Sequence, residues 1–276
     1  MNMDPTSVLV LLSILTLAMI ISPLGLGGGV LYVPIFLYVM EWSLHVSLVS
    51  SLILVWMVSL GSRIAHSKDG YADKEVGGKG TVSAILGTIL GTILSALLVE
   101  HIGEIIIISL ASLLMVWVIH RTAKKMHSEV NGHNANIGEN QEINDEQLSL
   151  YRKLCAGGGM ASGFLGIGGG AIFVTVHRQF LDWGHRKSAG TSYIIESWMI
   201  PMGILTHLIV DDTGAELWDI LGIWLFIAPI LMMACSYFGA TVAINYVPQK
   251  ALSYPFLLLV TLALIRYLVD IYGIIT

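Results

Sequence analysis

The chain has 276 residues, of which 55% are hydrophobic and only 12% are charged, and its mean hydropathy is +0.77. This composition excludes a soluble globular protein of this size and indicates an integral membrane protein. The formal net charge of −5 is small, and because the charges are few, their placement is more informative than their sum. We expect no nucleic-acid partner.

Apolar runs long enough to cross a bilayer as helices appear at six places in the chain. They are residues 47–64, 81–99, 104–120, 188–210, 217–245 and 251–269. Shorter apolar runs lie at 7–22, 30–40, 153–164 and 171–181. The first residues, Met1 to Pro5, lack the basic segment of a signal peptide, so we expect the first run to be retained in the protein.

Two glycine-rich stretches indicate a repeat. Residues 25–29 read Gly-Leu-Gly-Gly-Gly, and residues 166–170 read Gly-Ile-Gly-Gly-Gly. A shift of 141 residues aligns them without a gap from 22 to 66, and it also pairs residues of other types: Trp42/Trp183, Ser47/Ser188, Ser51/Ser192 and His66/His207. Chance matching of glycines does not explain these pairs, so we interpret the chain as two related halves. After an insertion of about seven residues, Gly91 pairs with Gly239.

The positions of the basic residues bear on how the two halves are oriented, because Lys and Arg collect in cytoplasmic loops. They gather in the 62–80 loop, in the 121–153 stretch, around 178–187 and at Lys250. Acidic residues gather in the opposite loops, among them Glu41, Asp211 and Glu216. All the basic loops can lie inside only if the chain crosses an even number of times between 153 and 181. The two runs there have about 11 residues each, too few to span a hydrocarbon core of about 30 Å.

We therefore expect a re-entrant hairpin of two half-helices, which enters from the cytoplasm and turns at residues 166–170. By the same reasoning, residues 7–40 form a hairpin that enters from outside and turns at 25–29. Irregular backbone at membrane depth is tolerated where it is buried in protein or lines a cavity.

The expected fold class is an all-α polytopic membrane protein with two inverted repeats, each a re-entrant half-helix hairpin plus three transmembrane helices. The first repeat covers 1–120, with the hairpin 7–40 and helices 47–64, 81–99 and 104–120. The second covers 153–276, with the hairpin 153–181 and helices 188–210, 217–245 and 251–269. Residues 121–152 form a linker that is expected to be cytoplasmic, because its 126–150 stretch is polar and aperiodic, and both termini are expected outside.

The glycine turns are predicted to form an anion site. The second half-helix of each hairpin begins at its turn, so its N-terminus points to the membrane centre with free N–H groups and a partial positive charge. Two such ends from opposite faces can hold an anion without a buried Lys or Arg. The candidate ligand-binding glycines are Gly25, Gly27, Gly28, Gly29, Gly166, Gly168, Gly169 and Gly170.

Hydroxyl groups can complete this site. Ser50 and Ser51 pair with Thr191 and Ser192, one turn into the helix that follows each hairpin. We expect them to contact the ligand; the alternative is that they bond to carbonyl groups of their own helices.

Three ionisable residues are candidates for proton coupling or gating. Glu196 is the one carboxylate deep inside a predicted span, and its repeat partner is Val55. Its alternative role is a carboxyl bonded to a neighbouring helix. His66 and His207 match across the repeat near the ends of their helices, where histidines also serve as caps.

Other chemistry finds little support in the sequence. The glycine clusters lack the strand–helix context of a dinucleotide site and the Gly-Lys-Ser/Thr of a P-loop, and there is no metalloprotease or serine-hydrolase motif. Cys155 and Cys235 form no disulfide or metal-ligand pattern, so we expect packing roles for them and neither a metal nor a cofactor. Gly87 and Gly91 fit a small-xxx-small face for close helix packing. The chain is not expected to be an enzyme.

Residues 163–170 (Gly-Phe-Leu-Gly-Ile-Gly-Gly-Gly), residues 188–192 (Ser-Ala-Gly-Thr-Ser) and the first-half echo at 23–29 resemble the TauE/SafE family of sulfite exporters. The resemblance covers essentially the whole chain. It implies transport of small anions such as sulfite, sulfoacetate and related sulfonates across the plasma membrane. The chain departs from the family at Thr175, where the family's second copy usually has proline and the first half here has Pro34.

The predicted function is thus a secondary transporter of a small anion, with one central site between two inverted halves. A passive anion channel, a transporter of a small carboxylate, and a membrane-embedded enzyme or assembly factor acting on a thiol or sulfite are the alternatives. The expected partners are the substrate anion and the lipid bilayer, with a homodimer as a further expectation.

Overall fold

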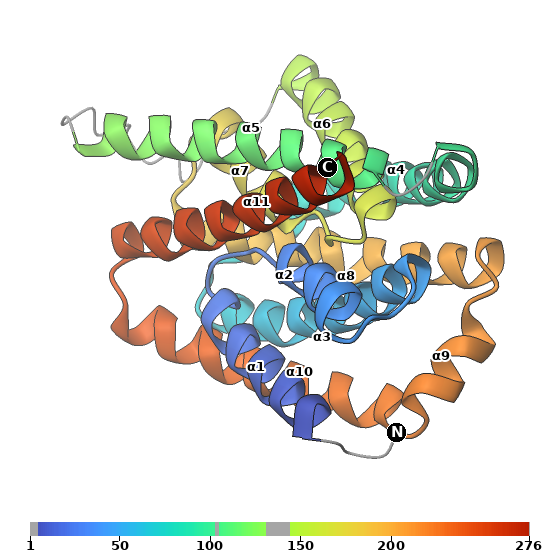
Figure 1. The fold of residues 1–276 in the computed structure, drawn as a ribbon. Helices are drawn as coiled ribbons and strands as arrows, with labels where there is room; N and C mark the ends of the chain where they lie inside the picture. The colour runs from blue at the N-terminus through green and yellow to red at the C-terminus, as the bar shows by residue number, and fades with distance from the viewer. Residues whose placement is uncertain (1–4, 103–104, 131–143, 276) are drawn as a thin grey trace.

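The computed structural model describes residues 5–102, 105–130 and 144–275, and within these ranges it contains helices and no strand (Figure 1). The elements are α1 (Pro5–Ile21), α2 (Gly29–Pro34), the π-helical η1 (Ile35–Val39), α3 (Leu44–Lys68), α4 (Lys74–Ile102), α5 (Ile105–Val130), α6 (Asp145–Leu165), α7 (Gly170–Phe180), α8 (His185–Val210), α9 (Gly214–Leu221), α10 (Trp224–Tyr246), the 3₁₀-helical η2 (Gln249–Leu252) and α11 (Ser253–Ile275).

Five helices of the described ranges are long and apolar enough to cross a membrane. They lie at Leu44–Lys68, Lys74–Leu98, His185–Val210, Trp224–Tyr246 and Tyr254–Gly273. The predicted span 104–120 falls in α5, whose 26 residues also have the required length, although residue 104 lies outside the described ranges. Together with the composition, these helices make the chain a multi-pass membrane protein.

One predicted span needs correction. Residues 217–245 were expected to form a single helix, but they form the end of α9 and most of α10, with a break at Gly222. Gly222 has a φ of 51°, and its N–H bonds to the carbonyl group of Trp218 at 2.8 Å, which ends α9. Apolar residues continue on both sides of the break, so hydropathy did not show it.

The linker is also more helical than predicted. Helix α5 continues to Val130 and α6 begins at Asp145, so the aperiodic stretch expected over 126–150 is helical at both ends. A reciprocal capping box starts α6: the side chain of Asn144 accepts from the N–H of Gln147, and the side chain of Gln147 accepts from the N–H of Asn144. Residues 131–143 lie outside the described ranges.

Equivalent backbone features recur 141 residues apart in the two halves. Helices α2 and α7 begin at Gly29 and Gly170, and Glu41 and Asp182, which follow the second half-helices, both have a φ of 55°. A second recurrence lies in the packing: a Cβ added at Gly91 would overlap the carbonyl oxygen of Met160, and one at Gly239 would overlap that of Met19. The local structure therefore follows the predicted register.

The two second half-helices differ where the sequence differs. Pro34 has no N–H to donate, and the segment after it, η1, is π-helical. Thr175, at the equivalent position, keeps its N–H, and its hydroxyl donates to the carbonyl group of Ala171 at 2.7 Å. Helix α7 is accordingly α-helical to its end.

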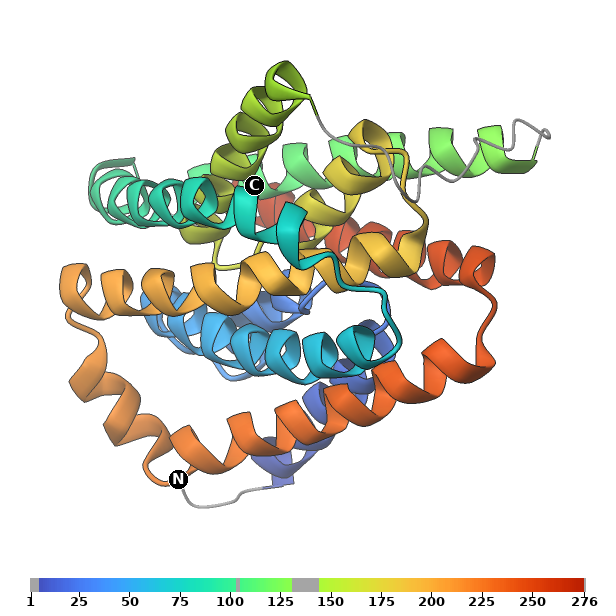
Figure 2. The ribbon, with the colours of Figure 1, turned by 180° about the vertical axis from the view of Figure 1, so that it is seen from behind.

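Helices α3 and α8 form the centre of the molecule and run antiparallel (Figures 1 and 2). A residue late in α3, Ser59, contacts Glu196 in α8, while the earlier Leu52 lies beside the later Gly203. Helix α4 packs on α8 and α6, α10 packs on α3 and α1, and α5 packs on α11. In an apolar 18-residue stretch of each helix, 72% is buried in α3 but only 24% in α11, so α11 lies at the periphery.

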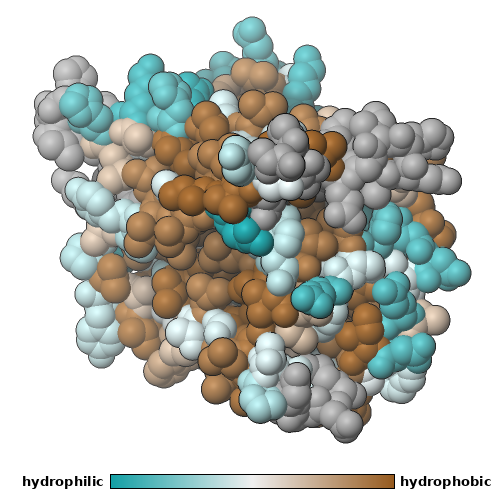
Figure 3. All heavy atoms as spheres, viewed as in Figure 1, coloured by the Kyte–Doolittle hydropathy of each residue, from teal (hydrophilic) through white to brown (hydrophobic). Residues whose placement is uncertain are grey.

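The outer helices expose large apolar side chains. On α4 these include Val82, Leu86 and Leu90, which are four residues apart and so lie on one face of the helix. In Figure 3, hydrophobic residues cover most of the middle of the visible surface, and hydrophilic residues gather at its left and right edges and at the top. An exposed apolar surface of this kind fits a lipid environment.

The loops rich in basic residues meet at one end of α3 and α8. There Lys187 pairs with Asp73 at 3.3 Å, and Arg186 donates to the carbonyl group of Val247 at 2.6 Å. At the other end His45 pairs with Asp211 at 3.0 Å. The fold thus separates the basic and acidic loops as the charge pattern requires.

Candidate functional site: two glycine turns at the centre

Two glycine turns meet at the middle of the structure. We name residues 25–28 turn 1 and residues 166–169 turn 2. Each contains three glycines with positive φ, between 65° and 98°, a region that residues with a Cβ rarely adopt. A Cβ added at Gly29 would lie 2.6 Å from backbone atoms of Ile167, so the turns are in direct contact. Only glycine allows this approach.

Each turn leads into a helix that starts at the contact. Turn 2 is followed by α7, which has 11 residues, and turn 1 is followed by the continuous apolar helix Gly29–Val39, formed by α2 and η1. The first N–H groups of a helix have no partner within it, and they carry partial positive charge. The predicted convergence of two helix N-termini is therefore present in the structure.

The side chain of Glu196 lies against both turns. It is 0% exposed. A Cβ added at Gly170 would lie 2.7 Å from its Oε1, and one added at Gly27 would lie 2.9 Å from its Oε2. The Oε2 atom accepts a hydrogen bond of 2.7 Å from the hydroxyl of Ser59 on α3. A carboxyl group, rather than an empty cavity, thus occupies the space beside the turns.

Val55, the repeat partner of Glu196, also lies against the glycine turns, but its side chain is apolar. A Cβ added at Gly27 would lie 2.6 Å from Cγ1 of Val55, and a Cβ at Gly168 would overlap the same atom. Val55 is fully buried. The centre is therefore symmetric in backbone and asymmetric in charge.

Of the four candidate hydroxyl residues, two lie at this centre. The hydroxyl of Ser51 donates to the carbonyl group of Gly166 in turn 2 at 2.9 Å. Ser192 donates to the carbonyl group of Ala189 in its own helix at 2.8 Å, and it also faces the Glu196 carboxyl. Both are buried.

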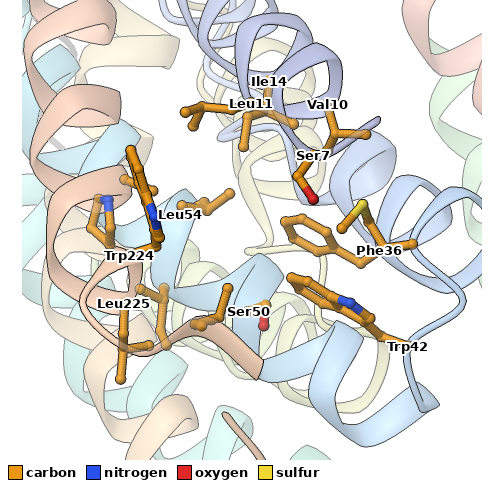
Figure 4. A pocket seen from close by; sticks show the side chains of 15 residues that line it. Ser7, Val10, Leu11, Ile14, Phe36, Trp42, Ser50, Leu54, Trp224 and Leu225 are labelled. Atoms are coloured by element: carbon orange, nitrogen blue, oxygen red, sulfur yellow. The ribbon is translucent and has the colours of Figure 1, made fainter. Parts of the chain in front are cut away.

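The other two hydroxyl residues lie elsewhere. The hydroxyl of Thr191 accepts from the N–H of Asp73, at 3.1 Å, in the loop between α3 and α4. Ser50 lines an apolar pocket bounded by α1, η1, α3 and the start of α10, next to Trp42 and Trp224 (Figure 4). A helix turns by about 100° per residue, so adjacent residues such as Ser50 and Ser51 point to different neighbours.

His207 joins the end of α8 to the end of α6. Its Nδ1 lies 2.7 Å from Oδ2 of Asp211, and its Nε2 lies 3.0 Å from the carbonyl oxygen of Gly163, three residues before turn 2. Because both partners are hydrogen-bond acceptors, a protonated imidazole makes both bonds and a neutral one makes a single bond. The residue is therefore linked to turn 2 through the backbone of α6.

Asp211 follows α8, and its side chain is only 1% exposed. Burial alone would raise the pKa of this carboxyl, but the hydrogen bonds from His207 and His45 outweigh that effect and lower the pKa to about 2. His45 lies at the start of α3, so Asp211 ties that helix to the end of α8.

His66, the repeat partner of His207, has different contacts. Its Nδ1 lies 2.9 Å from the carbonyl oxygen of Ser62, one turn back, and its Nε2 is buried without a hydrogen-bond partner among the described residues. Its ring lies 5.7 Å from that of Tyr193. In contrast to His207, no acidic side chain bonds to it in the described ranges.

Three contacts at the site were not predicted: those of Ser59, Val55 and Asp211. A signal for Ser59 exists in the sequence, since Ser47, Ser51 and Ser59 are separated by multiples of four residues and share one face of α3. Polar residues on one face of an apolar helix indicate buried partners, which are the carbonyl group of Gly166 for Ser51 and the carboxyl group of Glu196 for Ser59. No comparable signal marks Val55, because an apolar residue in a span is ordinary.

No group of three or more His, Cys, Asp or Glu side chains in the described ranges could hold a metal ion.

A comparison with protein-family models matched residues 9–267 to the model described as Sulfite exporter TauE/SafE. The chain belongs to the TauE/SafE family. Comparisons with curated proteins and with solved structures gave no significant match.

Membership of the TauE/SafE family makes the protein a membrane transporter of sulfite-type anions, as the sequence motifs had indicated. Its substrates are small anions, and part of its surface contacts the lipid bilayer. The family is one of transporters, which agrees with the expectation that the chain is not an enzyme.

Proposed function

We propose that this TauE/SafE protein is a secondary transporter that moves a small sulfur oxyanion, namely sulfite, sulfoacetate or a related sulfonate, across the plasma membrane. One observation carries the proposal: turn 1 and turn 2, one from each half of the chain, meet at one buried centre where two helices begin. Such a centre offers many N–H donors at once.

The chemistry of the turns suits an anion with several oxygens. Because the glycines have no side chains, a ligand can approach the main chain closely, and the helix N-termini attract negative charge without a buried Lys or Arg. Ser51 and Ser192 add hydroxyls beside the turns. The bulk of Glu196 and Val55 means that the turns must separate before a substrate fits between them.

An alternating rearrangement of two inverted halves provides that separation. Support for inversion comes from the antiparallel α3 and α8, which occupy equivalent positions in the 141-residue register. Two structurally equivalent helices that run in opposite directions are what a two-fold axis in the membrane plane produces. In this proposal the hairpin α1–α2 enters from one face and the hairpin α6–α7 from the other.

The sidedness follows from the charges. The end that carries Arg186 and Lys187 is proposed to be cytoplasmic, and the end that carries Asp211 external, because basic residues are retained inside. The termini and the 121–152 linker keep their predicted locations, outside and in the cytoplasm respectively. A homodimer stays a prediction.

Counterflow in proteoliposomes tests the function. Vesicles that contain the purified protein and unlabelled sulfite, or unlabelled ethanesulfonate, should take up a trace of the same labelled anion faster than empty vesicles do. A transporter exchanges the unmodified molecule, whereas an enzyme returns a changed product. Absence of exchange for both anions would refute the proposed function.

Two controls separate the remaining alternatives. A passive channel equilibrates the anion but does not accumulate it against its gradient, so accumulation in sealed vesicles excludes a channel. Competition by acetate or succinate as effective as that by sulfite would indicate a carboxylate transporter instead.

A further inference from the structure

The Glu196 side chain lies where the proposed function puts the substrate anion. Its two oxygens lie against Gly170, the first residue of α7 directly after turn 2, and against Gly27 in turn 1. It comes from the middle of α8 and is fully buried. The protein thus places one of its own carboxyl groups at the helix N-termini that would attract an external anion.

The hydrogen bonding of this carboxyl is incomplete. Oε2 accepts from Ser59 at 2.7 Å, but Oε1 is buried and has no hydrogen-bond partner among the described residues. A buried ionisable side chain in a membrane protein is costly and is a functional candidate for that reason. An unpaired oxygen is also where a proton can add.

The groups that face Glu196 carry no positive side-chain charge. Helix α3 contributes Val55 and the hydroxyl of Ser59 to the surroundings of the carboxyl group. The glycine segments contribute only backbone atoms. From its own helix come the hydroxyl of Ser192 and the nearby phenol of Tyr193, a titratable group that interacts with it. Within the described ranges no Lys, Arg or His bonds to the carboxyl. Hydroxyl donors, the helix N-termini and a proton, rather than a basic side chain, therefore offset its negative charge in the described part of the chain.

We propose that Glu196 is a proton-binding site that couples the movement of one substrate anion to one proton in the same direction. This inference rests on the proposed function. When ionised, the carboxylate is itself the anion at the turns, and a second negative charge beside it in the same buried site is strongly disfavoured. Addition of one proton converts the carboxylate to a carboxylic acid, which frees the turns for the substrate and gives the side chain an O–H donor.

After the halves rearrange, the anion and the proton leave on the other side, and the carboxylate returns to the turns. No bond other than the O–H bond forms or breaks. One monovalent anion and one proton move together, so the cycle is electroneutral. A pH difference should then drive accumulation on the more alkaline side, to a limit of about tenfold per pH unit, and the membrane potential should have no effect.

The test uses full-length protein in proteoliposomes, with ethanesulfonate as the probe, because the charge of a sulfonate is constant between pH 5 and pH 8 whereas that of sulfite is not. Wild-type vesicles that are alkaline inside should accumulate the probe. The Glu196→Gln variant has a neutral side chain of the same shape, so it should keep binding and counterflow but lose accumulation, with an inside-to-outside ratio near one. Persistent accumulation by Glu196→Gln would overturn the proposal, as would a folded variant that neither binds nor exchanges.

A second variant keeps the proposal testable if Glu196→Gln does not fold. Ser59→Ala removes the donor that favours the ionised carboxylate, so probe binding should persist to higher pH, with its midpoint raised by up to about one unit. Ser47→Ala makes the same change in a buried position three turns earlier on α3 and should leave the midpoint unchanged. An unchanged midpoint in Ser59→Ala would contradict the role of Glu196.

The failures of the two proposals are distinguishable. A wild-type protein that exchanges neither sulfite nor ethanesulfonate refutes the transport function. A wild-type protein that exchanges its substrate but never accumulates it under a pH difference refutes the proton coupling alone. If only sulfite is exchanged, the comparison of wild type with Glu196→Gln still applies, because the ionisation of sulfite is the same in both experiments.

Discussion

Glu196 and Val55 stand at equivalent positions in the two halves, yet one brings a carboxyl and the other a branched alkyl group to the same pair of glycine turns. At the scale of single residues, the turns depend on having no Cβ. Gly168 shows this twice, because its φ of 82° disfavours any other residue and because a Cβ there would overlap Val55.

Gly168→Ala should therefore weaken both the fold and substrate binding. We expect a loss of roughly 1–3 kcal/mol in unfolding free energy from backbone strain and crowding, together with loss of sulfite-induced thermal stabilisation. Val55→Ala in the same chain should restore part of the stability by removing the overlap, but not the cost of the positive φ. Thermal unfolding in detergent, with and without sulfite, measures both effects.

Gly157→Ala is the matched control, because Gly157 lies within α6 and a Cβ there has no neighbour within 4 Å. It should leave both stability and binding close to wild type. If Gly168→Ala bound sulfite as well as Gly157→Ala does, turn 2 would not be the site.

At the scale of elements, the ends of three helices meet through His207 and Asp211. Asp211 holds His45 at the start of α3 and His207 near the end of α8, and His207 in turn bonds to Gly163 near the end of α6. Because Gly163 precedes turn 2 by only three residues, this contact restrains the hairpin α6–α7. Among the residues that the structure describes, His66 makes no equivalent contact, so the two ends of the site are not held alike.

The low pKa of Asp211, about 2, predicts an acid-dependent loss of stability. Since its folded pKa is below the unfolded value of about 4, the carboxylate stabilises the fold above pH 4, and that contribution is lost as the pH falls toward 2. Asp211→Asn should lower the stability by roughly 1–3 kcal/mol at pH 7 and should lack this component between pH 4 and pH 2. Thermal unfolding across that range measures the difference.

Asp212→Asn, at the neighbouring exposed position, is the control and should follow wild type. Parallel pH profiles for wild type and Asp211→Asn would mean that the contacts of Asp211 with His207 and His45 contribute nothing to folding.

At the scale of the whole molecule, the loops at opposite ends of α3 and α8 should lie on opposite sides of the membrane. Asp211 and Lys187 are poor labelling positions because their side chains are largely covered, whereas Asp212 and Asp69 are exposed. With Cys235 replaced by Ala, Asp212→Cys should react with a membrane-impermeant thiol reagent applied to intact cells, and Asp69→Cys only after lysis. Equal reactivity of both in intact cells would contradict the proposed sidedness.

Much of the fold could be predicted from the sequence, because it depends on the properties of residues that are close together in the chain. A stretch of glycines must turn, an apolar run of about 20 residues must form a helix in a membrane, and the matched Trp, Ser and His residues define a 141-residue register that the backbone follows. The break at Gly222 was missed because the apolar residues continue across it, and the helical start at Asp145 was missed because its residues are polar.

The sequence by itself determined the all-helical membrane class, the family motifs, the two glycine turns and the isolated carboxylate of Glu196, since each is a property of neighbouring residues or of composition. Only the tertiary structure decided that the two turns touch, that Glu196 with Ser59 fills the space beside them, and that Ser50 and Thr191 lie away from it. The physical reason is that these facts depend on how α3 and α8 are rotated against each other and against the hairpins. Contacts between residues more than 100 positions apart in the sequence set that rotation, and no local sequence pattern encodes such contacts.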